Sequence, residues 1–304
     1  MARHLQQADH QITVGSRNII NAPDWLSQEK AAQIDWGDEG SLEKLCSGFD
    51  VVIQAAGMND QDCAADPVAA LEFNGLATSR LLAASIRAGV RRFVYLSTAH
   101  VYGSPLEGTI TEDTCPRNLH PYATSHLAGE NVVLNARQHR QIEGIVLRLS
   151  NAFGAPVHKH VNCWRLLVND LCRQAVETGK IVLHSSGFQR RDFIPMTEVC
   201  RIIEQLCTHD LDFDIKKSGV FNVGSGVSLS VIEIAQLVQR RSEVVLGFEP
   251  KLQRPKDHAD ERYEMLEYLP ENLTKLGINI SVCSNAEIDN LLSFCKASYG
   301  QGWS

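Results

Sequence analysis

Short apolar runs recur along the chain, separated by polar turns and by longer segments with helical periodicity. Unbroken apolar runs of this length are typical of parallel strands covered on both faces, because such strands show no alternation of polar and apolar residues. We predict buried strands at 50–54, 92–96, 144–149 and 219–223, and a short strand at 11–14 that is closed by a turn at 15–18. This alternation of strands and helices predicts an α/β fold with a mainly parallel sheet.

Helix boundaries are marked by residues that cap or break helices. Asp66 followed by Pro67 is a strong helix start, and Gly89 is a stop, so we predict a helix over 66–88. The same signals and the apolar spacing predict further helices over 2–8, 41–49, 121–138, 163–178, 196–207, 231–240 and 285–298.

Composition narrows the class of protein. The 304 residues are 44% hydrophobic, which is enough for one large domain or two coupled ones. The net charge is -7 and no run of five basic residues occurs, so nucleic acid is not an expected partner. We find no apolar stretch that could span a bilayer and no secretion signal at the start of the chain. The nine cysteines form no Cys-x-x-Cys pair, so we expect reduced thiols in a cytoplasmic protein without a metal site.

Candidate chemistry gathers between residues 93 and 126. Thr98 follows a predicted parallel strand, at the edge of the sheet where α/β proteins bind ligands. Tyr122 and His126 are four residues apart, so they share one face of the helix. A hydroxyl, a phenol and a cation that converge can move a proton while a hydride moves elsewhere. The alternative interpretation is that Tyr122 and His126 are helix residues without a catalytic role, at a boundary between domains.

The same stretch resembles the extended short-chain dehydrogenase/reductase family, the NAD-dependent epimerases and dehydratases that act on nucleotide sugars. The resemblance rests on Ser97-Thr98, on Val101-Tyr102-Gly103 and on Tyr122, while His126 stands where the family has Lys. It implies a Rossmann-type doubly wound parallel sheet with a smaller substrate-binding lobe. It also implies that Tyr122 is the acid/base that exchanges a proton with a sugar hydroxyl. Thr98 would hydrogen-bond the oxygen of that hydroxyl, and Ser97 would contact the substrate. With His126 in place of Lys, we expect a weaker shift of the Tyr122 pKa and slower chemistry.

The resemblance also implies a dinucleotide site in residues 1–153. In the family, an acidic residue at the end of the second strand favours NAD. This chain has Arg17 there, which favours NADP. The alternative is that Arg17 is a turn residue that faces solvent and binds no cofactor. The family implies further cofactor contacts. Asp35 and Trp36 would lie beside the adenine, and the small-residue turn Ala55-Ala56-Gly57 would lie beneath the cofactor. Asn74 would hold the strand ends near the cofactor, and Tyr122 and His126 would also contact it. Small residues at that turn can equally serve packing alone.

Residues 154–304 resemble the family's substrate lobe, with 193–224 returning to the sheet. Within the motifs that carry this resemblance, the implied contacts to the nucleotide sugar are Asn151, Asn162, Arg191 and Arg254. Arginine suits phosphate oxygens because its planar guanidinium donates two hydrogen bonds at once. The family also forms dimers through the helices predicted here at 66–88 and 121–138, which implies a homodimer.

One family feature is missing from the start of the chain. The strand and Gly-x-x-Gly-x-x-Gly turn that place backbone N–H groups on the cofactor pyrophosphate have no counterpart before residues 2–8. We expect either an N-terminal truncation or a protein that manages without this turn. The functional hypotheses are therefore an NAD(P)-dependent nucleotide-sugar epimerase, dehydratase or reductase in polysaccharide biosynthesis, a redox-silent nucleotide-sugar binding protein, or an inactive fragment.

Overall fold

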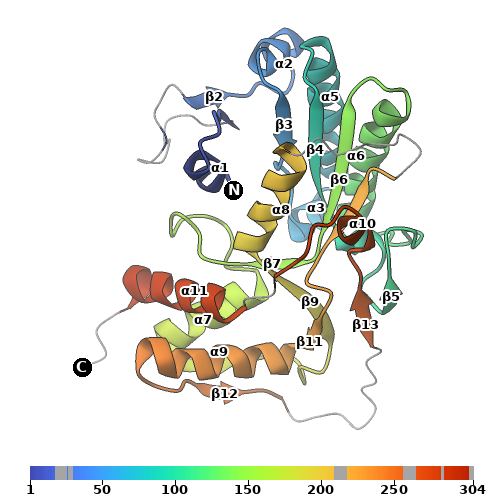
Figure 1. The fold of residues 1–304 in the computed structure, drawn as a ribbon. Coiled ribbons are helices and arrows are strands. Elements are labelled where there is room, and N and C mark those ends of the chain that lie inside the picture. Colours follow the sequence, from blue (N-terminus) through green and yellow to red (C-terminus); the bar gives the residue numbers. More distant parts are fainter. Residues whose placement is uncertain (18–25, 27–29, 209–217, 256–264, 282–283, 301–304) are drawn as a thin grey trace. The chain divides into compact units, whose positions relative to one another are not determined.

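A computed structural model describes the chain except for residues 18–25, 27–29, 209–217, 256–264, 282–283 and 301–304 (Figure 1). Its contacts divide the chain into two compact units. The first unit contains residues 1–104, 115–148 and 202–221, and the second contains 105–114, 149–201 and 222–304. None of the described helices is long and apolar enough to cross a membrane.

The first unit is built on a four-stranded sheet. Its order is β10-β6-β4-β3, from strands Val220–Val223, Glu143–Leu149, Arg92–Thr98 and Val51–Gln54. β3 and β4 are parallel, with Val51 beside Arg92 and Gln54 beside Tyr95. These strands confirm the four main strand predictions and the α/β fold.

β3 is less buried than its apolar sequence predicts. Val51, Val52 and Ile53 are only partly buried, and among the described residues β3 pairs with β4 alone, at the edge of the sheet. The expectation of a fully buried strand is wrong here because a strand is covered on both sides only when it has two neighbours.

A separate parallel ladder precedes this sheet. β1 (Val14–Ser16) pairs with β2 (Ala31–Gln33), and helix α1 (Ala2–Gln7) comes before them. The predicted strand at 11–14 is misplaced, because Gly15 and Ser16 belong to the strand and not to a turn. Helix α2 (Glu39–Cys46) then leads to β3, and the Asp38 side chain caps it by accepting from the Ser41 N–H.

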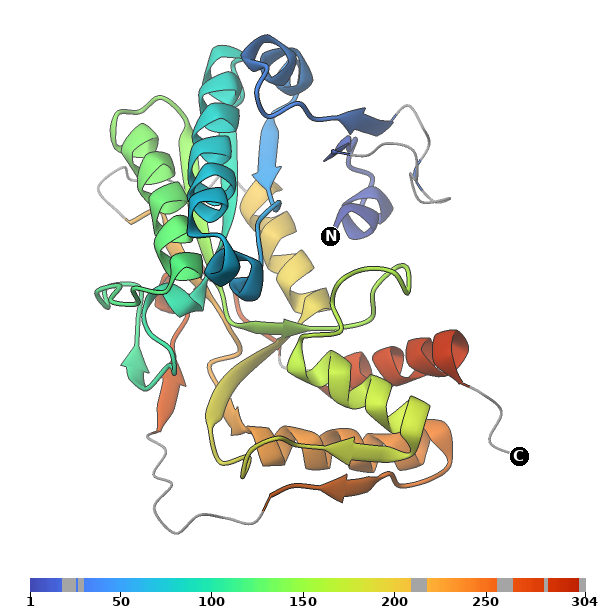
Figure 2. The same ribbon diagram turned by 180° about the vertical axis from the view of Figure 1, so that it is seen from behind.

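Helices cover one face of the four-stranded sheet, as the teal and green helices in front of the strands show in Figure 2. The predicted helix 66–88 is present, but it is interrupted. Asp66 caps α4 (Pro67–Ala70), a π-helical turn η2 (Leu71–Ala77) follows, and α5 (Thr78–Arg87) completes it. α3 (Asp60–Ala65) precedes it unpredicted, and α6 (Pro121–Gln138) has the predicted bounds. Apolar residues of α2, α5, α6, β4 and β6 form the core of this unit.

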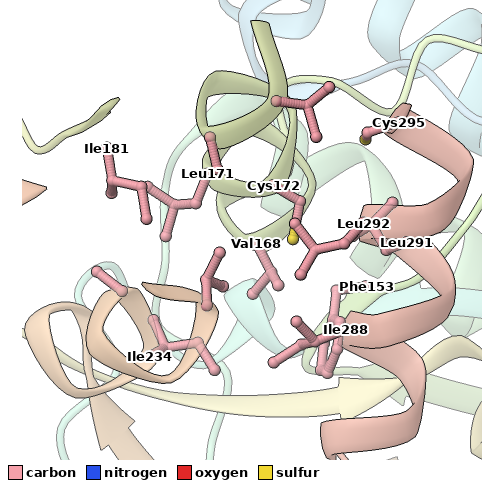
Figure 3. Packing of buried hydrophobic residues seen from close by; sticks show 14 of the residues in the cluster. Phe153, Val168, Leu171, Cys172, Ile181, Ile234, Ile288, Leu291, Leu292 and Cys295 are labelled. Carbon is pink, nitrogen blue, oxygen red and sulfur yellow. The ribbon is translucent and has the colours of Figure 1, made fainter. Parts of the chain in front are cut away.

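The second unit packs α7 (Leu167–Thr178), α9 (Val231–Leu246) and α11 (Ser284–Tyr299) around the core shown in Figure 3. Leu171, Ile234 and Leu291 lie in this core and are fully buried. The predicted start of α7 at residue 163 is wrong, because the helix begins at Leu167 and residues 163–166 are largely turn.

Short strands surround these three helices. A three-stranded sheet has the order β11-β9-β7, and two further pairs are β12-β8 and β13-β5. The strands are β5 (Gly108–Ile110), β7 (Asn151–Phe153), β8 (Lys180–Val182), β9 (Arg190–Pro195), β11 (Ser228–Ser230), β12 (Lys251–Gln253) and β13 (Leu266–Tyr268). The remaining helices are η3 (Ala99–Val101), α8 (Met196–Thr208), which crosses from the second unit to the first, and α10 (Glu271–Lys275).

Candidate active site

Thr98 and Tyr122 lie together in the first unit. Thr98 ends β4, and its hydroxyl oxygen accepts a hydrogen bond from the His100 N–H at 3.1 Å, which fixes the side chain. Tyr122 stands in the first turn of α6. Burial raises the pKa of its phenol, and a side-chain hydrogen bond with Thr98 lowers it in part. The phenol is therefore protonated at neutral pH.

His126 lies one helical turn beyond Tyr122. The two rings meet edge to face, with centroids 4.7 Å apart. Burial lowers the pKa of His126 to about 4, so the imidazole is neutral at physiological pH. A neutral ring cannot supply the fixed positive charge that a Lys would bring to a neighbouring phenol.

Each edge of the His126 ring has a different neighbour. Nδ1 lies 3.0 Å from the hydroxyl of Tyr95, a buried residue of β4. The opposite edge borders Gly57, because a methyl group added to Gly57 would lie 3.6 Å from Cε1 and 3.7 Å from Nε2.

The turn Ala55-Ala56-Gly57 after β3 is exposed, and Asn74 anchors it. The Met58 N–H donates to Asn74 Oδ1, and Asn74 Nδ2 donates to Ser125 Oγ, both at 2.9 Å. Asn74 thus connects the turn to α6. It lies in the π-helical turn and is 1% exposed, which excludes the alternative of a surface residue. Such π-helical turns are frequent at functional sites.

Beneath these residues lies a buried ion pair that sequence reasoning missed. Glu130 is fully buried and accepts from Arg148 Nη2 at 2.6 Å and from the Ser97 hydroxyl at 2.5 Å. Ser97 is therefore hydrogen-bonded inside the unit, and its contact with substrate stays a prediction. The available signal was that Glu130 follows His126 by four residues on the same helix, while Arg148 interrupts an apolar strand.

Arg17 and Trp36 meet on a residue that sequence reasoning did not single out, Phe73. The Arg17 guanidinium lies 5.4 Å from the centre of the Phe73 ring, and Trp36 meets this ring edge-on at 5.6 Å. Asp35 accepts from the Gly37 N–H at 2.8 Å. Arg17, which follows β1, is therefore an exposed cation that lies on the Phe73 ring of η2, and Trp36, which follows β2, packs against the same ring.

A hollow of about 670 Å³ separates this ladder from the four-stranded sheet. Val14 of β1 and Ile53 of β3 line it, together with Gln54. Gln54 is 3% exposed, and its Nε2 has no hydrogen-bond partner in the described part of the chain. A buried donor without a partner suits a polar ligand group at this point.

The predicted substrate residues belong to the second unit. Asn151 Nδ2 donates to the Asp192 carbonyl at 2.9 Å, and Asn162 is exposed in a bend before α7. Arg191 is partly buried, and burial lowers its pKa; it donates to Gln189 at 3.0 Å. Arg254 is exposed, donates to the Ser186 carbonyl at 2.7 Å and stacks on Phe188.

Asp192, next to Arg191, is a structural centre that sequence reasoning missed. Its buried carboxylate accepts from the hydroxyls of Ser150, at 2.5 Å, and Ser225, at 2.8 Å. It also accepts from the Ser225 N–H at 2.8 Å. Asp192 thus connects β9 to the segments that follow β6 and β10. Across the described residues, no group of three or more His, Cys, Asp or Glu is arranged to hold a metal ion.

Comparison with known proteins matches residues 1–224 to the model of the NAD dependent epimerase/dehydratase family. Relatives include the low-salt glycan biosynthesis protein Agl12 of Haloferax volcanii, 27% identical over 75% of this chain and 71% of that protein. The dTDP-D-glucose 4,6-dehydratase of Mus musculus is 27% identical over 71% of this chain and 60% of the enzyme. The match thus spans less than two thirds of the mouse enzyme.

Solved structures with the same fold include the UDP-glucose 4-epimerase of Thermus thermophilus in complex with NAD. Its TM-score is 0.77 at 20% identity, over 98% of this chain and 94% of that one. MoeE5 in complex with UDP-glucose and NAD has a TM-score of 0.75 at 23% identity, over 98% of this chain and 94% of that one.

Proposed function

Because the chain belongs to the NAD-dependent epimerase/dehydratase family, we propose that it is an NAD(P)-dependent enzyme that epimerises, dehydrates or reduces a nucleotide sugar. The observation that carries the proposal is the convergence of Thr98, Tyr122 and His126 beside the exposed turn 55–57. All of these residues belong to the first unit.

The residues at this turn fit the nicotinamide end of a dinucleotide. Ala55, Ala56 and Gly57 leave the backbone uncrowded, while Tyr122 and His126 offer a hydroxyl and an imidazole to ribose oxygens. A bound nicotinamide would accept a hydride from the sugar and return it. The described residues contain no glycine-rich turn that leads from a strand into a helix.

The proton step falls to Tyr122. In the oxidising direction the phenolate takes the proton of a sugar hydroxyl, and in the reducing direction the phenol returns it. Thr98 keeps its own proton free to donate, because its oxygen already accepts from the His100 N–H. This single proton can be donated either to the phenolate or to the sugar oxygen, and it stabilises the negative charge on whichever oxygen accepts it.

We assign the nucleotide and its phosphates to residues of the second unit. Arg191 and Arg254 supply guanidinium groups, and Asn151 and Asn162 supply amides, all of which suit a diphosphate and a sugar. Arg17, an exposed cation on the Phe73 ring, supports a preference for NADP because it can pair with a 2′-phosphate. We also propose a cytoplasmic enzyme of polysaccharide biosynthesis.

A homodimer is proposed through α4, η2, α5 and α6. Val68, Leu71 and Leu76 are exposed apolar residues on the first two of these helical segments. A second copy of the chain would cover them. In light scattering, we expect the wild type to be a dimer and Leu71→Glu to be a monomer. The control is Val244→Glu, which changes an exposed residue on α9 of the second unit and should leave the dimer intact.

The test of the proposed activity uses the purified chain with NAD or NADP and either dTDP-glucose or UDP-glucose. We expect an epimerised or dehydrated sugar, or an oxidised sugar if the enzyme is a reductase running in reverse, detected by mass spectrometry and NMR. Tyr122→Phe should lower kcat about 100-fold or more, because the phenol is the acid/base. Tyr299→Phe removes a surface hydroxyl that donates to the Lys159 carbonyl, and it should leave kcat unchanged.

A redox-silent binding protein is the second candidate, and the neutral state of His126 favours it. Without a cation beside it, Tyr122 retains its proton and is a weak base. Binding of the nucleotide sugar by calorimetry, with no conversion by wild type at any pH, would establish this second function in place of the first.

A further inference from the structure

Tyr95 lies directly behind His126. It belongs to β4, is 1% exposed, and its hydroxyl oxygen is 3.0 Å from His126 Nδ1. We infer that Tyr95 is a positioning residue, whose hydroxyl donates to His126 Nδ1 and holds the proton of the imidazole on Nε2, the nitrogen beside Gly57. This inference rests on the proposed function, in which Nε2 serves a bound dinucleotide.

The direction of this hydrogen bond follows from the acceptors within reach of Tyr95. Its single proton can go to His126 Nδ1 at 3.0 Å or to the Asn74 carbonyl at 3.4 Å, and we assign it to the shorter contact. The Thr78 hydroxyl also bonds the phenol and lowers its pKa in part, as a donor to the phenol oxygen does. Burial, with a contribution from Glu130, raises the pKa of Tyr95 far above its ordinary value, so the hydroxyl is always present as a donor. A neutral imidazole has one donor and one acceptor nitrogen, so acceptance at Nδ1 leaves the proton on Nε2.

The helix residue Gly129 makes room for this contact. A methyl group at Gly129 would lie 2.6 Å from the Tyr95 hydroxyl oxygen and 2.8 Å from the Asn74 carbonyl. Glycine is unfavourable inside a helix, and here any larger residue would displace the phenol from His126. The glycine and the tyrosine therefore form one arrangement that fixes the imidazole.

Nε2 is the nitrogen left for a ligand. It forms no hydrogen bond with any described residue, and its ring edge borders Gly57 in an exposed turn. With its proton fixed there, His126 presents a donor to a sugar oxygen of the cofactor. A lysine carries three protons and needs no such orientation, whereas an imidazole in the wrong tautomer would present a lone pair.

The tautomer can be read directly in the unloaded protein. We would label the chain with ¹⁵N-histidine, record long-range ¹H–¹⁵N spectra, and assign His126 by comparison with His126→Gln. We expect a protonated Nε2 and an unprotonated Nδ1. In Tyr95→Phe the signals should shift toward a mixture of tautomers. Tyr268→Phe is the matched control, because it removes another fully buried hydroxyl, bonded at 2.9 Å to Asn222 in the second unit.

The wild-type spectrum alone can overturn the inference, since a proton on Nδ1 would show that Tyr95 accepts rather than donates. A Tyr95→Phe spectrum identical to wild type would also overturn it. As a second measurement, the Kd for NADPH should rise about tenfold in Tyr95→Phe and not in Tyr268→Phe. Absence of NADPH binding by wild type would count against the proposed function, while the tautomer would still decide the role of Tyr95.

Discussion

The ring of His126 meets the ring of Tyr122 edge to face, with centroids 4.7 Å apart and an angle of 71° between the planes. The contact places a neutral aromatic group beside the phenol. Burial acts on both rings in the same sense, since it keeps the phenol protonated and the imidazole uncharged. At neutral pH the proposed site therefore holds a protonated phenol, and little phenolate is available to accept a proton.

The first prediction concerns the pH dependence of sugar oxidation. Because burial raises the pKa of Tyr122, the fraction of phenolate should grow about tenfold per pH unit below that pKa. We expect kcat/KM for the oxidising direction to rise through the alkaline range without a plateau near neutrality. Sugar reduction uses the protonated phenol and should be flat over the same range. A plateau of the oxidising rate at neutral pH would contradict the assignment of Tyr122 as the base.

The second prediction is that His126→Lys raises the rate at neutral pH. An ammonium within about 4–6 Å of the phenol would lower its pKa by about 1–3 units, which increases the phenolate at least about tenfold. The rise of kcat/KM with pH should move toward neutrality by the same amount. His126→Gln is the control, because it offers a hydrogen bond without charge and should not move the profile. A profile for His126→Lys that coincides with that of His126→Gln would argue against an electrostatic role at this position.

The third prediction links His126 to stability in acid. Its pKa falls from 6.5 to about 4 on folding, so between these values the unfolded chain binds a proton that the folded chain does not. This contribution to the free energy of unfolding therefore decreases as the pH falls from about 6.5 to 4. The loss is about 3 kcal/mol when complete. In urea unfolding, His126→Gln should lose less stability over this range than wild type. The exposed His184→Gln should behave like wild type, and equal slopes for all three proteins would exclude the effect.

The fourth prediction concerns the buried pair of Glu130 and Arg148. Removal of one partner leaves an uncompensated charge inside the first unit, so Glu130→Ala should lower the free energy of unfolding by about 3–5 kcal/mol. Replacement of both partners, as Glu130→Leu with Arg148→Met, should recover most of this loss. The surface pair of Arg87 and Glu43 is the control, and its loss should cost about 1 kcal/mol or less. Urea unfolding measures all three, and a double variant no more stable than Glu130→Ala would contradict the explanation.

The sequence alone was sufficient to predict that Thr98, Tyr122 and His126 lie close together. Two rules did so: parallel strands present their carboxyl ends at one edge, and residues four apart share a helix face. The charge state of His126 could not be predicted, because it depends on burial by residues distant in sequence. Tyr95 was missed for the same reason, since its only local signal was that of a core strand.

The helix predicted over 66–88 shows a similar limit. Its start at Asp66 and its end before Gly89 are local signals, and both are correct. Between them lies the π-helical turn Leu71–Ala77, which apolar spacing did not predict, and Asn74 within it bonds to Met58 and Ser125. The partial exposure of β3 was equally hidden, because an apolar run does not reveal how many neighbours a strand has.

The fifth prediction follows from Asn74, which holds the turn after β3 through the Met58 N–H and holds α6 through Ser125. Asn74→Ala leaves the partners of a buried amide unpaired, so we expect a loss of about 1–3 kcal/mol in the free energy of unfolding. Amide exchange over residues 55–59, followed by mass spectrometry, should become faster than in wild type. Asn118→Ala is the control, because its amide donates to the His100 carbonyl at 2.7 Å in another loop of the same unit. Unchanged exchange at 55–59 in Asn74→Ala would mean that the turn is held by its own backbone. If the turn loosens as expected, the Kd for NADPH should rise with it, because the proposed cofactor contacts at Gly57 and His126 depend on this anchor.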